Sequence, residues 1–244
     1  MTTAPSNPTS FEIDGRTVTM PVHVREARQA AATFLVDAHA AQRVIDATGL
    51  RVATKATGKA IASIALIDYL DNDLGTYHEL ALAFLVADPP GTPPAPKGSV
   101  STYIHRLPVS EEFTCAAGRA IWGFPKWVAP LQVAFDERGA TATLTHEGAD
   151  VVRVTMRRGP IPLPRRPLSM NAYSCDDSGV VRRTPWTTTT RTGHQRVRPG
   201  GTTVEIFYGH PMCDELRALG LPKNAVVTMF DDHMQATFES PVVV

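Results

Sequence analysis

The chain carries no net charge, because its 244 residues include 24 basic and 24 acidic side chains. A protein whose main partner is a nucleic acid or an anionic membrane usually presents an excess of positive charge. The balance therefore argues against both kinds of partner and favours small molecules or protein chains. Since little net charge opposes self-association, we also expect a homo-oligomer.

Long apolar segments are missing as well. Residues 1–10 contain neither the basic start nor the apolar stretch of a signal peptide, and no apolar run approaches the ~20 residues of a membrane span. We therefore predict a cytoplasmic protein with no membrane partner. The Ser/Thr/Pro/Asn-rich residues 1–10 are expected to be disordered, ahead of a single domain over residues 11–244.

Cysteine and phosphate-binding glycine are also scarce. Three widely spaced cysteines, Cys115, Cys175 and Cys213, form neither a CxxC pair nor an even disulfide framework, and we interpret them as buried thiols. No glycine-rich phosphate loop follows any predicted strand, which argues against nucleotide cofactors. We expect neither a cofactor nor a metal ion.

Short β-type runs dominate what is present. Residues 60–70 and 77–87 are apolar runs joined by a turn-rich segment, and they are expected to be buried on both faces. Residues 131–135 and 141–146 alternate with period two and predict a hairpin that residues 151–156 extend. Residues 225–230 and 234–238 predict two closing strands.

Three short helices are expected, each with an end signal in the sequence. Asp37 predicts the start of a helix over 38–47 with Gly49 at its C-terminal cap, and Ser110 predicts the start of a helix that Gly123 and Pro125 end. A third covers about 211–219. Some ten to twelve strands against three helices predict a mainly β, β-dominated α+β fold in one domain.

Lys126 is the candidate for chemistry, because it lies between bulky apolar neighbours just past a predicted helix end. Burial of an ammonium group disfavours its charged form, so we expect a lowered pKa and a nucleophilic free amine near neutral pH. Such an amine forms Schiff bases with ketones and aldehydes. The alternative interpretation is a surface lysine whose stem covers Phe124 or Trp127.

Three motifs together carry a resemblance. Gly-Arg-x-x-x-Gly-Phe-Pro-Lys over residues 118–126 resembles the Schiff-base lysine segment of acetoacetate decarboxylases, a system that is itself a standard example of a lysine with a depressed pKa. Leu-Gly-Thr-Tyr-His-Glu over 74–79 is similar to the strand that supplies the family's active-site glutamate. Residues 215–222, followed by closing strands, are similar to its C-terminal helix and hairpin.

The resemblance implies an oligomeric, cone-shaped antiparallel β-barrel with Lys126 as nucleophile and Glu79 beside it as proton carrier. It also implies an arginine for the substrate carboxylate, for which Arg25 or Arg28 and, alternatively, Arg119 are candidates. Phe124 and Trp127 are expected to line the substrate site. Two further acids of the family's pattern fall at Ile64 and Ala120 and are absent.

Three functions stay open at this point. The first is a cofactor-independent lyase that decarboxylates a β-keto acid through an imine and enamine on Lys126. The second is an aldolase-dehydratase that condenses a 2-oxo acid with an aldehyde through the same enamine. The third is a non-catalytic barrel that binds an apolar ligand. In each case the partner is a small molecule, an oxo acid for the two enzymes.

Overall fold

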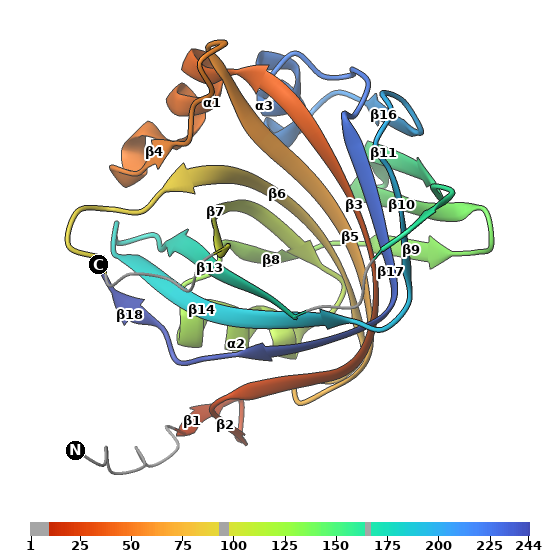
Figure 1. Cartoon of the computed structure of the whole chain (residues 1–244). Coiled ribbons are helices and arrows are strands. Elements are labelled where there is room, and N and C mark those ends of the chain that lie inside the picture. Colours follow the sequence, from red (N-terminus) through yellow and green to blue (C-terminus); the bar gives the residue numbers. More distant parts are fainter. Residues whose placement is uncertain (1–9, 93–97, 164–166) are drawn as a thin grey trace.

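Seven strands curve round a lumen and close into a barrel in the computed structural model, which describes residues 10–92, 98–163 and 167–244 (Figure 1). The strands follow the order β17-β3-β5-β6-β7-β13-β14, and a pairing between β14 and β17 closes the ring. Most neighbours are antiparallel, whereas β13 pairs with β7 in parallel. The barrel strands are β3 (Val22–Asp37), β5 (Lys59–Asn72), β6 (Tyr77–Ala87), β7 (Val100–Val109), β13 (Pro167–Cys175), β14 (Val181–Thr190) and β17 (Val227–Phe238).

A second, four-stranded sheet packs against one outer face of the barrel. Its order is β16-β11-β10-β9, formed by β9 (Leu131–Phe135), β10 (Gly139–His146), β11 (Ala149–Arg157) and β16 (Thr202–Ile206). The helix α3 (Pro211–Ala218) lies beside it, whereas α1 (Ala38–Ile45) contacts β3 and β5 of the barrel (Figure 1). The shorter elements are the 3-10 turn η1 (Asp46–Thr48) and strands β4 (Arg51–Val52), β12 (Ile161–Pro162), β15 (Gly193–Arg196) and β18 (Val242–Val243).

Period-two alternation divides the side chains of the long strands between this outer core and the lumen. On β3, Phe34 and its even-numbered neighbours are buried in the core against the second sheet, whereas Gln29, Ala31 and Thr33 line the lumen. The same division holds on β5 and β6, since successive side chains of a strand point to opposite faces. The expectation that residues 60–70 and 77–87 are buried on both faces holds for the outer face, whereas Ser63, Ala65 and Ala83 on the lumen face are only half-buried.

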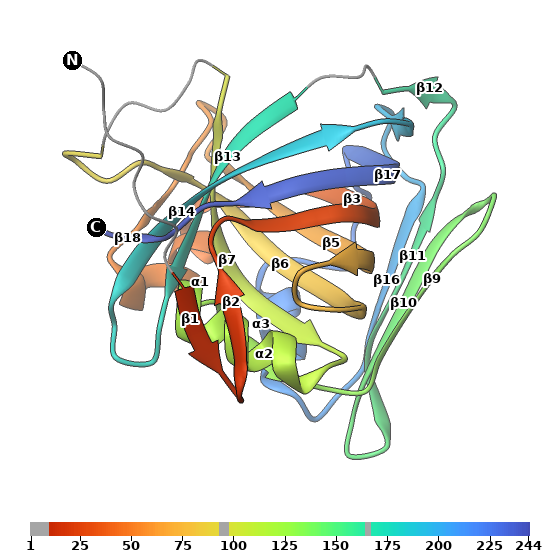
Figure 2. The ribbon, with the colours of Figure 1, turned by 90° about the horizontal axis from the view of Figure 1, so that it is seen from below.

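One end of the barrel is covered by α2 (Glu112–Trp122) and by the hairpin of β1 (Ser10–Ile13) and β2 (Arg16–Thr19), which lie side by side (Figure 2). A second apolar cluster holds them there, with Ile13, Val18, Phe113 and Ile121 among its members. The short strand β8 (Lys126–Val128) follows α2 and pairs in parallel with β7. This end is where the candidate chemistry lies.

The predicted mainly β, single-domain fold with few short helices is confirmed, but some details differ. Asp37 caps α1 as expected, with its Oδ1 accepting from the Ala40 N–H at 2.9 Å. Glu111 rather than Ser110 caps α2, because the Ser110 hydroxyl is engaged by the His78 N–H at 2.9 Å. The two expected closing strands are one continuous strand, β17, with register shifts near Asp231 and Met234. All of the expected disordered segment except Ser10 lies outside the described residues.

Candidate active site

Lys126 is delivered to the closed end of the barrel by the way α2 ends. Gly123 adopts the left-handed conformation at φ 65°, which a residue without Cβ reaches at no steric cost, and its N–H bonds back to Arg119. The chain then turns through Phe124, and Lys126 starts β8 opposite Leu107. Its side chain points inward and is 3% exposed.

Gly118 makes room for the lysine stem. A Cβ at this helical position would lie 2.6 Å from Cδ and 2.8 Å from Cε of Lys126, closer than non-bonded carbons approach. Thr114 lies one turn earlier on the same helix face and its Oγ1 is 3.2 Å from the Lys126 Nζ. The stem therefore crosses α2 at a glycine and brings the amine to a buried hydroxyl.

The Lys126 amine has two further polar neighbours. Its Nζ lies 3.0 Å from Glu79 Oε2 and 3.4 Å from the Tyr77 hydroxyl. It also lies 4.8 Å from the centre of the Tyr77 ring. These contacts come from β6 and α2, two elements far apart in sequence, so the barrel and the helix together make the site.

Glu79 is held as firmly as the lysine. Its residue is 6% exposed, and the Tyr69 hydroxyl donates to its Oε1 at 3.2 Å, which leaves Oε2 for Lys126. Tyr69 and Tyr77 are paired across β5 and β6, with ring centroids 4.3 Å apart and stacked. Burial raises the pKa of both phenols, so both hydroxyls are protonated at neutral pH.

The charge state of the pair differs from the sequence-based expectation. Burial lowers the pKa of the Lys126 ammonium group, but the nearby Glu79 carboxylate raises it, and the net shift is upward. The expected low pKa is therefore wrong for the resting protein. The sequence showed the apolar neighbours of Lys126 but not the carboxylate that the fold places 3.0 Å away. At rest the site holds an ammonium–carboxylate ion pair.

The pair faces a cavity of ≈ 230 Å³ that runs through the barrel lumen. Within the described ranges, Lys126 and Glu79 are the only lysine, arginine, aspartate or glutamate side chains that line it. Most other lining groups are aliphatic, aromatic, thioether or small hydroxyl side chains. The closed end is buried, whereas Thr33, Ser63 and Met229 are partly exposed at the other end. Carbonyl compounds can therefore reach the buried Lys126 amine through the partly exposed end.

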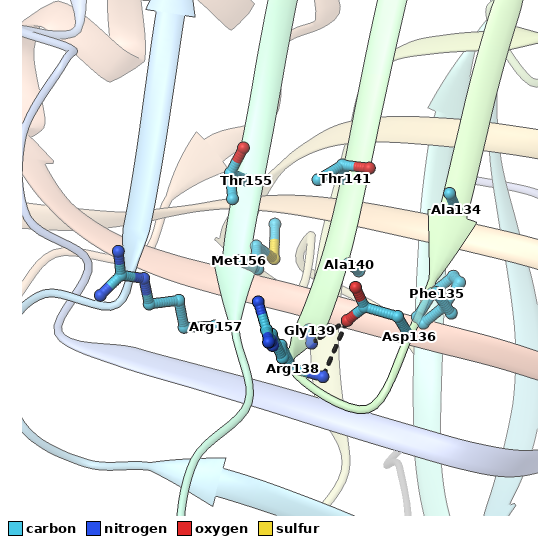
Figure 3. Close-up of a pocket in the computed structure, with 10 residues that line it drawn as sticks. All are labelled: Ala134, Phe135, Asp136, Arg138, Gly139, Ala140, Thr141, Thr155, Met156 and Arg157. Atoms are coloured by element: carbon cyan, nitrogen blue, oxygen red, sulfur yellow. Dashed lines mark hydrogen bonds between the residues drawn. The ribbon is translucent and has the colours of Figure 1, made fainter.

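A second concavity, of ≈ 210 Å³, lies on β9–β11 and offers no comparable chemistry (Figure 3). The carboxylate in it, Asp136, accepts the backbone N–H groups of Arg138 and Gly139 at 2.8 Å each and so fixes the hairpin turn. Elsewhere, no group of three or more His, Cys, Asp or Glu side chains in the described segments could hold a metal ion. No described helix is both long enough and apolar enough to cross a membrane.

The sequence matches the family model of acetoacetate decarboxylase (ADC) over residues 6–238. The chain belongs to the acetoacetate decarboxylase family. A sequence comparison with curated proteins gives no match. The resemblance drawn from residues 74–79, 118–126 and 215–222 is thereby confirmed.

Solved structures share the fold across nearly the whole chain. Acetoacetate decarboxylase from Legionella pneumophila superposes with a TM-score of 0.68 at 17% identity, covering 99% of this chain and 92% of its own. The enduracididine biosynthesis enzyme MppR, complexed with the condensation product of pyruvate and imidazole 4-carboxaldehyde, gives 0.65 at 14% identity, covering 98% and 97%. An acetoacetate decarboxylase-like enzyme from Sphingomonas wittichii RW1 gives 0.59 at 13%, covering 94% and 96%.

The arginines expected at the substrate do not reach the cavity of this family member. Arg25 is half exposed and donates to Asp71 at 2.9 Å and to Asp73 at 2.5 Å, while Arg28 is exposed on the same strand. Arg119 pairs with Asp177 and donates to the Lys126 carbonyl oxygen at 3.1 Å. Arg119 therefore braces the backbone of the lysine instead of facing the lumen.

Other expected positions divide in the same way. Phe124 lines the cavity, whereas Trp127, whose side chain points to the opposite side of β8, packs on the outer core and stacks with His210 at 6.0 Å. Ile64 is buried in the outer core and Ala120 is exposed on α2. An acid at either of these two positions would not face the lumen of this chain.

Sequence reasoning did not assign a role to Tyr69, Tyr77, Thr114 or Gly118. Two of them were nevertheless inside quoted motifs, because Tyr77 precedes Glu79 by two residues and Gly118 opens the lysine segment. Thr114 could have been found from its helical spacing of four to Gly118. Tyr69 needed the strand register, which no local pattern gives.

Proposed function

We propose that this protein is a cofactor-independent Schiff-base lyase in which Lys126 forms an iminium with the ketone of an oxo acid and Glu79 carries protons. The observation that supports this most directly is a lysine Nζ and a carboxylate oxygen 3.0 Å apart, both almost fully buried, at the closed end of an apolar cavity. Nucleophilic amines of this kind split difficult carbon–carbon chemistry into easier covalent steps.

The reaction starts with a proton transfer inside the pair. Glu79 takes a proton from the Lys126 ammonium, and the free amine attacks the substrate carbonyl to give a carbinolamine. The Glu79 carboxylic acid then protonates the carbinolamine hydroxyl, water leaves, and an iminium faces a carboxylate again. Tyr69 keeps the glutamate oriented during both transfers, since it donates to the oxygen that does not face the lysine.

Decarboxylation of a β-keto acid follows from the iminium. The electrons of the breaking carbon–carbon bond pass to the iminium nitrogen, carbon dioxide leaves, and a neutral enamine remains. Glu79 takes one proton from solvent and delivers it to the enamine carbon. Water then adds to the new iminium, Glu79 accepts the proton, and the ketone product leaves the regenerated lysine.

The charge of the cavity favours decarboxylation. No arginine among the described residues lines the lumen, so a substrate carboxylate has only the iminium as a cationic partner. A carboxylate that leaves as neutral carbon dioxide escapes the unfavourable burial of its charge, whereas a retained carboxylate does not. We therefore place decarboxylation ahead of the condensation of a 2-oxo acid.

An aldolase-dehydratase is the second candidate, and the size of the cavity supports it. A lumen of ≈ 230 Å³ has room for a second reactant beside a small enamine. The fold neighbour MppR is described with a condensation product of pyruvate and an aldehyde. In this reaction the enamine carbon attacks an aldehyde and water is lost from the adduct.

Reductive trapping tests the shared imine step. Incubation with acetoacetate or pyruvate and cyanoborohydride is expected to add the reduced substrate to Lys126, detected by peptide mass spectrometry. Lys126→Arg is expected to abolish the adduct with the fold intact, because a guanidinium stays protonated. Lys223→Arg, at a lysine outside the cavity, serves as the matched control.

The products then separate the candidates. Release of carbon dioxide from acetoacetate supports decarboxylation, and an unsaturated product from pyruvate and an aldehyde supports condensation. An unmodified Lys126, no more reactive than the other lysines, would leave the non-catalytic ligand-binding barrel as the interpretation.

A further inference from the structure

We infer that the substrate carries an uncharged, apolar substituent of about aromatic-ring size, which occupies the lumen between Lys126 and the open end of the barrel. This inference rests on the proposed Schiff-base function and adds the substrate class to it. It concerns the group on the far side of the carbonyl from the reacting carbon.

The cavity continues well beyond the reacting pair. Glu79 is in register with Ile67 and Gln29, and the next rung toward the open end consists of Ala81, Ala65 and Ala31. The rung after that consists of Ala83, Ser63 and Thr33. At about 3.3 Å per residue, these two rungs extend the lumen by roughly 13 Å from Glu79.

The two rungs leave space because their side chains are small. Ala31, Ala65, Ala81 and Ala83 line the cavity on adjacent strands, where larger aliphatic residues would fill the barrel. The acetoacetate methyl group needs none of this space. A broad, apolar group can lie against the alanine wall.

Other parts of the lining are aromatic and flexible. Trp186 and Phe238 stack with centroids 5.0 Å apart and nearly parallel rings, and Met170 and Met229 lie in the same lining. Thioether side chains adapt to irregular apolar shapes and contact aromatic rings favourably. Met229 is 38% exposed, so it lies where a substrate enters.

Charge along this stretch is absent in the part of the chain that the structure describes. The cavity lining contains one cation and one anion, Lys126 and Glu79, which neutralise each other. A charged group placed beside the alanine rungs would be buried without a partner. A neutral group would lose nothing there.

The volume fits this class of substituent. A cavity of about 150 Å³ lined by aliphatic and aromatic groups accepts benzene. The lumen measures ≈ 230 Å³, which leaves room for a ring together with the carbonyl arm that reaches Lys126.

Three methyl ketones that differ only in this substituent test the inference on the wild-type protein. Acetone, benzylacetone and the para-carboxy derivative of benzylacetone are each trapped on Lys126 with cyanoborohydride over a range of concentrations. We expect benzylacetone to half-saturate at about 100-fold lower concentration than acetone, given the area of a buried ring. The carboxylated probe is expected to half-saturate at a concentration at least about tenfold above that of benzylacetone, because its charge is desolvated.

Variants in the alanine rungs locate the subsite. Ala81→Leu fills the lumen next to Glu79 and is expected to reduce the preference for benzylacetone over acetone, measured in the same variant, about tenfold or more. Ala83→Leu, nearer the open end, gives a second reading if Ala81→Leu folds poorly. Ala134→Leu, at an exposed position on β9, is the matched control.

The outcomes distinguish this inference from the proposed function. Trapping of all three ketones on Lys126 at concentrations within about threefold overturns the substituent and leaves the Schiff-base function standing. A preference for the carboxylated probe overturns it as well. Absence of any adduct with the three ketones and with acetoacetate overturns both.

Discussion

At the scale of single residues, the site is a proton shared between two buried groups. The Lys126 amine and the Glu79 carboxylate lie 3.0 Å apart, and both are shielded from water. An isolated ammonium in this place would lose its proton readily, whereas the ion pair keeps it. The glutamate therefore has two effects: it holds the resting lysine protonated, and it accepts the proton when substrate arrives.

Replacing Glu79 by Gln separates these two effects. The carboxylate that raises the Lys126 pKa is removed while burial, which lowers it, stays, so the acid limb of the pH–rate profile is expected to move to lower pH. The maximal rate of imine formation is expected to fall roughly 100-fold to 10,000-fold, since the proton carrier is lost. Trapping rates measured across pH test both. Glu137→Gln, in an exposed turn, is the control. An acid limb that does not move in Glu79→Gln would contradict the ion pair.

Gly118→Ala tests the lysine's path across α2. The new Cβ would lie 2.6 Å from the Lys126 Cδ, so the stem must move while the backbone need not. Displacement of a reacting group by about 1 Å can cost roughly 100-fold in rate, whereas Ala in a helix stabilises it by up to about 1 kcal/mol relative to Gly. We expect slow trapping with undiminished thermal stability. Ala120→Gly, on the exposed face of α2, is expected to lower the thermal stability and to leave the trapping rate unchanged. A wild-type trapping rate in Gly118→Ala would show that the lysine stem can take another path.

At the scale of elements, α3 is fastened to the barrel by a partly buried carboxylate. Glu215 accepts from Arg106 of β7 through both oxygens, at 2.9 and 2.5 Å, and His105 lies 3.1 Å away. Burial raises the pKa of Glu215, but the hydrogen bonds from Arg106 and the neighbouring His105 imidazole have the larger effect and lower it to about 2. Because the folded pKa is below its usual value of 4.5, the stabilisation is present above about pH 4.5 and is lost as pH falls toward 2.

Glu215→Gln is therefore expected to lower the free energy of unfolding by about 2 kcal/mol at pH 7, with a difference that shrinks below pH 4. Urea unfolding at several pH values measures this. The matched control is Glu205→Gln, whose pair with Arg153 at 3.6 Å is largely exposed and is expected to contribute under about 1 kcal/mol. Equal losses in the two variants would rule out the Glu215–Arg106 hydrogen bonds as the cause.

Elements with clear alternation or caps could be predicted from the sequence, and others could not. The hairpin of β9 and β10 and the Asp37 cap follow from local patterns, and the structure has them. The strand β14 is rich in threonine and arginine, and β13 mixes serine and asparagine with apolar residues, so no apolar period marks either strand. Their pairing with β7 and β17 depends on barrel closure, which is a property of the whole chain.

The same limit applies to the candidate site. Lys126 and Glu79 could be singled out because each lies in a local motif, and their encounter requires only that the barrel closes. The sequence could not predict which face of its strand Arg25 or Trp127 occupies. A β-bulge or a shift of the strand's first residue moves the side chain to the other face. The homo-oligomer stays a prediction.

At the scale of the whole molecule, one buried carboxyl group lowers the stability of the fold when it is ionised. Asp231 is 8% exposed at the register shift of β17, where it pairs with Gln29 of β3, and within the described segments no lysine, arginine or histidine forms an ion pair with it. Its side chain accepts the His233 N–H at 3.2 Å. Burial raises the pKa of Asp231 to about 6, although a hydrogen bond from Thr190 opposes the shift.

A folded pKa above the unfolded value of 3.8 means that the protonated acid fits the fold better than the carboxylate. Its contribution to stability is complete below about pH 4, falls as pH rises through 6, and is absent above. Asp231→Asn mimics the protonated acid, so it is expected to raise the free energy of unfolding by about 2–3 kcal/mol at pH 7–8 and to remove this part of the pH dependence.

Asp232→Asn, which breaks the 2.6 and 2.7 Å hydrogen bonds with Arg158, is expected to destabilise the protein under the same conditions. Urea unfolding between pH 4 and 8 distinguishes the neighbours, and a loss of stability in both variants would show that Asp231 is ionised and satisfied in the folded protein.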